Sequence, residues 1–341
     1  MAVKEEFRTG FTAYLKEKES ASEELASKVV DQIWKIIEDS SSYLFCASHA
    51  FAMACDSLYA AYLKAHYPYE FYMTMLKHYT AKRNLAKIAS IMSEMGAYRS
   101  ITMTAPTFGQ DNTDWFINKE ENTVSPSLSY VKFISDTAAK ELAGAQHCKT
   151  FCDVLFWAIR ESSVNMRQIQ TLIDIGYFRN YGGQNKLNYI MDQFLNGKSR
   201  ITRTTKGWVV RLDALKKLEA ETEDSDVPAY KKAQRENELM GLCFSSDPTI
   251  KFTYLVTDVD AKYGAKIRFY NVGTGKYSPF IRMKKDFYEL TQPKVGELFN
   301  LNPLVDCKYQ SKRVFSGGKS VPVPGEKETW IFHYERMKEA A

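Results

Sequence analysis

The sequence predicts an α+β chain of several domains, in which a mostly α-helical N-terminal two thirds precedes a β-rich C-terminal part. Over residues 5–95, and again over 130–195, apolar residues recur at the spacing of amphipathic helices. After Pro248 the spacing changes to the alternation of half-buried strands. With 341 residues and a hydrophobic fraction of 45%, the chain is long enough for two or three domains that each bury a core.

The first region, residues 1–96, is predicted to hold three or four helices. Ile33, Trp34 and Ile37 mark the apolar face of one of them. Pro68 should end or kink the helix before it, because proline lacks the amide proton that continues a helix. Gly96 is expected to close the last helix of this region.

The second region covers residues 97–199. Residues 97–128 are rich in Thr, Asn, Pro and Asp and are expected to be a connector with a short strand at 115–117. Helical spacing then predicts helices over residues 130–145, 150–161, 166–175 and 184–195. Asn165 suits the N-cap of the third of these, since its side-chain oxygen can accept a free amide of the first turn.

A short third region covers residues 200–249. Residues 200–211 place β-branched residues on both sides of Lys206 and Gly207, which predicts a small basic hairpin. Residues 219–226 are acidic and polar and are expected to be a linker. Helical spacing predicts one further helix over residues 229–240.

The last region, residues 250–341, consists of alternating runs separated by turns rich in Gly, Pro and Lys. The predicted strands cover residues 253–259, 265–272, 278–283, 298–304, 306–314 and 329–334. About five short strands with few helices in roughly 90 residues are typical of an OB-like β-barrel. A fragment of a β-sandwich is the alternative.

Charge, cysteine content and hydropathy argue against several classes of protein, namely zinc proteins, secreted disulfide scaffolds and membrane proteins. The net charge of +5 reflects 46 basic and 41 acidic residues, so local clusters of cations say more about nucleic acid than the overall field does. The six cysteines lack the paired spacing of a zinc site or a secreted disulfide scaffold, so reduced thiols in the core are expected. No signal peptide or long apolar run is visible, which predicts a cytoplasmic chain without membrane contact.

The segment from Ser48 to Pro68 reads SHAFAMACDSLYAAYLKAHYP. It resembles, without a gap, a helix in the fingers domain of bacterial family-C replicative DNA polymerases, the DNA polymerase III alpha subunits. Later segments resemble the same family in the same order: Val164-Asn165, Leu172-Ile173, Gly176-Tyr177-Phe178, Glu238-Leu239-Met240-Gly241-Leu242 and Ser245-Ser246-Asp247-Pro248. The resemblance covers roughly residues 5–250.

This resemblance implies a role for the Ser-His helix. In the family the segment lies beside the incoming nucleotide, so Ser48, His49 and Lys64 become candidate nucleotide-binding residues. The family's Asn-Lys before Ser-His is Cys46-Ala47 here, which removes a donor for phosphate. The alternative is that His49 hydrogen-bonds within a helical core and that Lys64 stabilises the C-terminal end of its helix.

The resemblance also places residues 97–199 in the family's connector and helix-hairpin-helix region. The family's Gly-Val-Gly turn lets backbone amides approach a DNA phosphate, because glycine has no Cβ to block the approach. Phe133, Ile134 and Ser135 occupy those positions here, beside a retained Lys132. We therefore expect a degenerate helix-hairpin-helix.

Sequence-independent DNA binding is expected from cations that neutralise phosphates and from an aromatic ring that stacks on an unpaired base. The candidate DNA-binding residues are Lys82, Arg83, Lys132, Arg200, Arg203, Lys206, Tyr309, Lys312 and Arg313. For any one cluster, an ordinary solvated surface is the alternative. Gln184, Leu187 and Tyr189 loosely match a peptide that binds a sliding clamp, although an amphipathic helix face explains them better.

In the family, the catalytic carboxylates that bind two Mg²⁺ ions lie in a palm domain encoded before the segment that this chain resembles. No catalytic and no metal-binding residue is therefore assigned here, and Mg²⁺ is expected on a palm-bearing partner chain. We interpret the chain as the C-terminal part of such a polymerase, from distal fingers (1–96) to an OB-like domain (250–341). It should bind primer-template and single-stranded DNA and should be inactive alone. Alternatives are a stand-alone DNA-binding or replisome-interaction protein derived from such a polymerase and, with less support, an unrelated enzyme.

Overall fold

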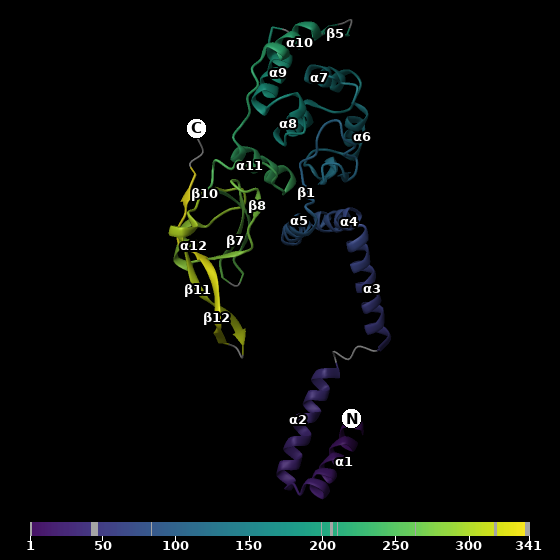
Figure 1. The fold of residues 1–341 in the computed structure, drawn as a ribbon, viewed down its shortest axis with the longest axis vertical. Coiled ribbons are helices and arrows are strands. Elements are labelled where there is room, and N and C mark those ends of the chain that lie inside the picture. Colours follow the sequence, from purple (N-terminus) through teal and green to yellow (C-terminus); the bar gives the residue numbers. More distant parts are fainter. Residues whose placement is uncertain are drawn as a thin grey trace. The chain divides into compact units, whose positions relative to one another are not determined.

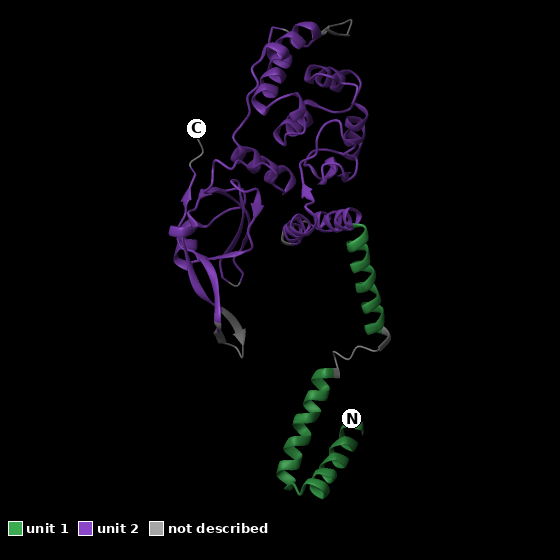
Figure 2. Ribbon diagram, in the orientation of Figure 1, with its two compact units in different colours: residues 1–67 green, residues 68–341 purple. Residues whose placement is uncertain are grey.

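The computed structural model describes residues 2–41, 47–82, 84–198, 200–204, 207–209, 211–262, 264–316 and 319–337. The chain divides into two compact units, residues 1–67 and 68–341 (Figure 2). The described residues of the first unit form helices, and those of the second combine helices with β-sheets. The α+β class predicted from the sequence is confirmed.

The first unit begins with two helices, α1 (Ala2–Glu19) and α2 (Glu23–Ser41), which pack side by side (Figure 1). The ring of Phe7 on α1 lies against the ring of Trp34 on α2, with centroids 5.3 Å apart. A third helix, α3 (Ala47–His66), carries the Ser-His segment. This aromatic contact contributes to the packing of α1 against α2.

The second unit begins with α4 (Pro68–Ala81) and α5 (Leu85–Arg99). Pro68 is the first residue of α4, so the prediction that it ends the preceding helix is confirmed. The prediction that Gly96 closes α5 is wrong, because the helix continues until Ser100 takes a left-handed conformation with φ of 54°. A glycine inside a helix costs only about 1 kcal/mol, and the buried face of α5 outweighs that cost.

A small sheet follows α5. Its strands are β1 (Thr102–Met103), β2 (Phe116–Asn118) and β3 (Thr123–Ser125), in the order β1-β3-β2. Strand β2 confirms the short strand predicted beside Trp115. The guanidinium of Arg179 donates to two carbonyl oxygens of the connector, each at 3.0 Å, and so ties this segment to the helices that follow.

The helical part of this unit contains η1 (Leu128–Tyr130), α6 (Asp136–Gly144), α7 (Phe151–Arg160), α8 (Met166–Asp174), η2 (Arg179–Tyr181) and α9 (Gln184–Asn196). The single helix predicted over residues 130–145 is wrong in its first part. Residues 131–135 form a loop, and the hydroxyl of Ser135 caps α6 by accepting the amide of Ala138 at 3.2 Å. Asn165 caps α8 as predicted, in a reciprocal capping box with Gln168.

Helix α9 packs as an ordinary amphipathic helix. Gln184 and Leu187, two residues of the loosely matched clamp-binding peptide, are buried, whereas Tyr189 is half exposed. The side-chain amide of Gln184 donates to the carbonyl oxygen of Asp174 at 3.0 Å. This burial favours the interpretation of these residues as a core-facing helix.

The segment between this helical part and the C-terminal sheet contains the hairpin β4 (Thr202–Thr204) and β5 (Gly207–Val209), followed by α10 (Leu212–Glu221) and α11 (Ala229–Met240). The two strands pair antiparallel, so the predicted hairpin is confirmed. Helix α11 has the bounds expected from the sequence.

The prediction of an acidic linker over residues 219–226 is wrong for residues 219–221, which belong to α10, whereas residues 222–226 lie in the segment that connects α10 to α11. Glu219 is buried on α10, and its carboxylate accepts the backbone amides of the first two residues of α7, at 2.8 and 2.9 Å. Asp224 and Asp226 accept two amides at the start of α9, at 2.7 and 3.0 Å. Carboxylates are favourable at such positions because the first amides of a helix lack partners within the helix.

The C-terminal part contains β6 (Thr253–Asp260), β7 (Lys266–Asn271), β8 (Lys276–Tyr277), β9 (Ile281–Met283), α12 (Lys285–Thr291), β10 (Leu298–Asn300), α13 (Pro303–Asp306), β11 (Cys307–Ser316), β12 (Lys319–Ile331) and β13 (Glu335–Arg336). These strands form one sheet in the order β11-β12-β9-β7-β6-β10-β13, with β8 paired to β7. The predicted β-rich part is confirmed. Because β11 and β13 end the sheet without pairing to each other among the described strands, the OB-like barrel is not confirmed.

Two strand boundaries differ from the sequence prediction by four residues or more. The strand expected over residues 298–304 stops at Asn300, because Asn302 caps the short helix α13 by accepting the amide of Leu304 at 3.1 Å. Strand β12 begins ten residues earlier than expected, at Lys319 rather than at Thr329. Strand β12 thus includes Pro322 and Pro324, although proline cannot donate to a ladder.

Helix α11 lies between the helical core and the sheet. Ala233 packs with Leu255 and Tyr270 of the sheet, while Leu239 belongs to the core formed by α6 to α10. Its C-terminal end therefore meets the loop at residues 131–135, where the amide of Lys132 donates to the carbonyl oxygen of Leu239 at 2.9 Å.

Candidate nucleic-acid interface

The loop at residues 131–135 contains Phe133, Ile134 and Ser135, the positions that the sequence resemblance assigned to a glycine turn. Val131 and Ile134 are buried and fix the loop to the core, whereas Phe133 is exposed and has a φ of 70°. Glycine adopts this left-handed region without strain, but a bulky residue does not. The amides of Lys132 and Ile134 already donate to carbonyl oxygens of the protein. The loop therefore cannot offer these two amides to a phosphate.

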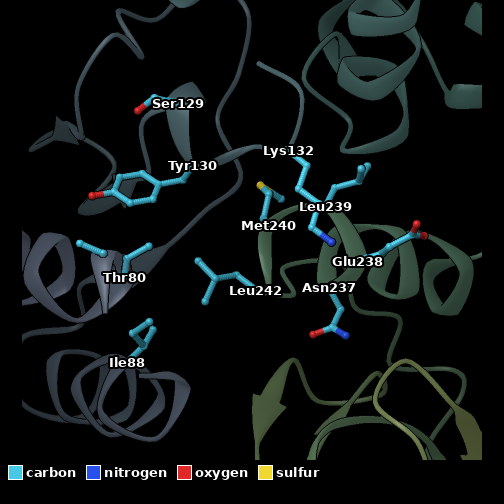
Figure 3. A pocket seen from close by; sticks show the side chains of 12 residues that line it. Thr80, Ile88, Ser129, Tyr130, Lys132, Asn237, Glu238, Leu239, Met240 and Leu242 are labelled. Atoms are coloured by element: carbon cyan, nitrogen blue, oxygen red, sulfur yellow. The ribbon is translucent and has the colours of Figure 1, made fainter. Parts of the chain in front are cut away.

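A cavity of about 420 Å³ lies beside this loop (Figure 3). Its lining comprises Thr80, Ala81, Ile88, Ser129, Tyr130, Lys132 and residues 237–242. Asn237 is only 7% exposed, and its side chain lines this cavity. Figure 3 shows the side chain of Lys132 extending from its loop toward Asn237. A cation and a buried amide thus converge on one cavity.

A second cavity, of about 610 Å³, continues along α11. It shares Lys132, Asn237 and Glu238 with the first cavity and extends to Gln234 and Val295. The same stretch of α11 therefore borders both spaces, and Asn237 lines both.

The charges around these cavities are unequally compensated. The carboxylate of Glu238 pairs with Arg235 at 2.5 Å, and Arg235 also pairs with Asp174. The hydrogen bond to Asp174 raises the pKa of Arg235 above its usual value. Lys132, in contrast, has no carboxylate partner among the described residues. Arg235 is therefore shared by two carboxylates, and Lys132 adds a cation at the cavity that no described carboxylate pairs with.

The structure brings two of the predicted DNA-binding cations to this place. Lys82 follows Ala81, which lines the first cavity, and its side chain is exposed. Lys132 lines both cavities. Arg83, the third candidate in this part of the sequence, lies outside the described residues.

Among the remaining basic candidates, Arg200 has a described side chain, and it lines neither cavity. Arg200 is exposed in the turn before β4. Arg203 lies on β4 and Arg313 on β11, but their side chains, like all of Lys206, are outside the described part of the chain. Their proposed contacts with phosphate stay predictions.

Two further candidates lie, like Arg313, on the long strand β11. Tyr309 is 74% exposed, as a ring that stacks on a base must be. Lys312 pairs with Glu326 of β12 at 2.6 Å, and this hydrogen bond raises the pKa of Lys312. Part of its charge is therefore already taken by Glu326.

The predicted nucleotide-binding residues all lie on α3. The side chain of Ser48 is outside the described residues, His49 is exposed and Lys64 is partly buried. Large apolar side chains of α3 are also exposed: Phe51, Met53, Leu58, Tyr59, Tyr62 and Leu63, between 48% and 72%. A surface helix normally turns such residues to a core, so α3 has an apolar surface that the first unit does not cover in its described part.

Within the described ranges, no group of three or more His, Cys, Asp or Glu side chains is arranged to hold a metal ion. None of the described helices combines the length and the apolar character needed to cross a membrane.

Comparison with known proteins points to the same family as the sequence motifs. No protein-family model matches the chain. The DNA polymerase III subunit alpha of Ureaplasma parvum is 24% identical over 302 residues, which are 85% of this chain and 29% of that protein. The proteins of the same name from Bacillus subtilis and Campylobacter jejuni are 27% and 24% identical and cover 69% and 67% of this chain.

The similarity is to DNA polymerase III subunit alpha. These matches support the family resemblance seen in the sequence motifs. The chain spans less than a third of each of these polymerase subunits, namely 29%, 21% and 20% of their lengths.

Sequence reasoning missed Asn237 as a site residue. It lies four residues after Ala233, on the face of α11 that is buried, so a polar residue at a core-facing helical position was the available signal. Thr80 was missed too, and its buried hydroxyl has no hydrogen-bond partner among the described residues. Nothing in the local sequence of α4 distinguishes it from other threonines.

Proposed function

We propose that this chain is a DNA-binding part of a replicase similar to DNA polymerase III alpha, and that it holds primer-template and single-stranded DNA. The observation that carries the proposal is the convergence of Lys132 and Asn237 on one cavity, with Lys82 beside it. Similarity to polymerase subunits over most of this chain supports a role in DNA replication.

The chemistry of this site fits a DNA phosphate. A phosphodiester oxygen can accept from both the Lys132 ammonium and the Asn237 amide, and contacts of these two types are common at DNA backbones. An uncompensated lysine contributes further by displacing condensed counterions. The amide nest of the family's glycine turn is replaced here by side-chain donors.

The test is fluorescence anisotropy of the full chain with an overhang duplex across a salt series. Lys132→Gln should weaken binding and lower the slope of log affinity against log salt by roughly one unit. Asn237→Ala should weaken binding with the slope unchanged, because the amide is neutral. Lys231→Gln is the matched control, since Lys231 is exposed on the same helix and lines neither cavity. If Lys132→Gln and Lys231→Gln change the affinity and the salt slope equally, Lys132 does not bind a DNA phosphate and the proposed site is refuted.

The C-terminal sheet and the basic hairpin are proposed to add sequence-independent affinity. Open OB-like sheets bind single strands through aromatic rings and cations, and Tyr309 and Lys312 lie on β11 with Arg203 on the hairpin. If a chain without residues 250–341 binds single-stranded DNA as tightly as the full chain, the sheet serves protein contacts instead.

A second candidate function is completion of a nucleotide pocket together with a palm-bearing chain that binds Mg²⁺. The exposed apolar surface of α3 favours it, because such a surface needs a partner. With such a partner, adding this chain should restore primer extension, and His49→Ala should raise the nucleotide KM or lower kcat. His333→Ala, at an exposed histidine of the other unit, is the control. If His49→Ala leaves the rate of primer extension unchanged, this second candidate function is refuted and the stand-alone DNA-binding alternative is favoured.

A further inference from the structure

Phe133 has a side chain that its backbone conformation disfavours. Its φ of 70° lies in the left-handed region, where a bulky residue is strained and glycine is not. Its ring is also 55% exposed, so burial does not compensate for the strain. Residues in such conformations persist where the surrounding structure fixes them, and they cluster at functional sites.

The surroundings of Phe133 fix this conformation. Val131 and Ile134, on either side of it, are buried in the core. The carbonyl oxygen of Phe133 accepts the side-chain amide of Gln168 at 3.0 Å, and the amide of Ile134 closes the turn onto Val131 at 3.2 Å. Glycine would satisfy the same backbone contacts without strain, so the fold itself gives no reason for the ring.

Arg167 is a second locally unfavourable choice at the same spot. It lies in the first turn of α8, where the helix dipole disfavours a cation. No carboxylate pairs with it in the described part of the chain. Its guanidinium lies 4.3 Å from the centroid of the Phe133 ring, which is a cation–π contact. The ring and the cation are thus held together at the surface, next to Lys132.

We propose that Phe133 and Arg167 form a stacking platform for one unpaired DNA base at a junction between duplex and single strand. An aromatic ring backed by a cation stacks on any base, and neighbouring cations follow the phosphates. Lys132, the preceding residue, binds the adjacent phosphate. The inference rests on the proposed DNA binding and specifies which part of the DNA this loop recognises.

The charge of the patch favours DNA over a protein partner. Phe133 is flanked by two cations that lack carboxylate partners among the described residues, Lys132 and Arg167, and both suit a polyanion. The loop itself exposes a single large apolar side chain, whereas an apolar protein interface needs a contiguous patch.

The experiment uses the full chain and Phe133→Gly, which removes the ring and the strain together. Its affinity for an overhang duplex should fall by about 5- to 150-fold with an unchanged salt slope, as expected for loss of one stacked base. Its melting temperature should rise, because glycine relieves the backbone. With 2-aminopurine as the first unpaired base, the fluorescence quenching produced by the wild-type chain should disappear.

Further variants separate the possible causes. Phe133→Tyr keeps a ring and should retain both affinity and quenching, while Arg167→Gln should weaken binding less than Phe133→Gly. Tyr189→Ala removes a half-exposed ring on α9 and is the control. If Phe133→Gly binds the overhang duplex normally, or melts at a lower temperature, the platform is refuted while DNA binding through Lys132 stands. If the wild-type chain binds no DNA at low salt, the proposed function itself fails.

Discussion

Replacing Glu219 with alanine should destabilise the helical core of the second unit by about 3 kcal/mol. The buried carboxylate of Glu219 accepts the amides of Phe151 and Cys152 at 2.8 and 2.9 Å, and both of these residues are fully buried. Each buried amide left without a partner costs about 1–3 kcal/mol. The two amides together therefore cost about 2–6 kcal/mol. Water that enters the space of the lost side chain recovers part of this cost, so we expect a loss in the lower half of that range. Glu219→Gln keeps one accepting oxygen and should lose about half as much.

The assay is urea unfolding followed by circular dichroism, with hydrogen exchange of the α7 amides as the local readout. Glu221→Ala is the matched control, because Glu221 lies on the same helix, is 65% exposed, and meets Lys217 only at 3.8 Å. Glu221→Ala should lower the free energy of unfolding by less than about 0.5 kcal/mol. Equal losses for the two variants, or unchanged exchange at the start of α7, would refute the capping role of Glu219.

Three further predictions concern pH, single-strand binding and catalysis. Burial raises the pKa of Asp226, but hydrogen bonds from Lys232 and from the amide of Gln184 outweigh it and hold the pKa below the ordinary value of 3.8. The stabilisation by Asp226 is therefore fully present above pH 3.8 and is lost as the pH falls through the lowered pKa. Asp226→Asn should lower the free energy of unfolding by about 1 kcal/mol at pH 7. Its melting temperature should also fall less steeply with decreasing pH on the acid side. Tyr309→Ala should weaken single-strand binding by about 1–3 kcal/mol with an unchanged salt slope, and unaltered anisotropy would assign the exposed ring to another role. The isolated chain should extend no primer with Mg²⁺ and nucleotides, and incorporation that survives repurification would contradict this.

Local signals predicted much of the fold. Helix α11 matches its expected bounds, Asn165 caps α8, and Pro68 begins α4, because periodicity, caps and proline geometry act within a few residues. The basic hairpin and most strands of the C-terminal sheet were predicted for the same reason. The errors at Gly96 and in the acidic segment arose where distant packing outweighed local preference.

The candidate site was only partly predictable. Lys132 and Lys82 were identified from the sequence as cations, but nothing local placed Lys132 beside Asn237. The exposed ring of Phe133 and its contact with Arg167 also escaped prediction. A left-handed φ at a phenylalanine depends on the buried residues on either side of it. Helical spacing predicted a continuous helix there, although the family resemblance placed a turn at these positions.

The sequence by itself determined the order and type of most elements and the resemblance to replicative polymerases, because these depend on side-chain periodicity and on contiguous motifs. The tertiary structure decided which distant segments meet. Glu219 caps a helix 68 residues before it, and the C-terminal end of α11 completes the cavity at Lys132. Periodicity shows which face of an element is buried, but not which partner covers it, and unpaired backbone amides are satisfied by whichever acceptor the fold brings within reach.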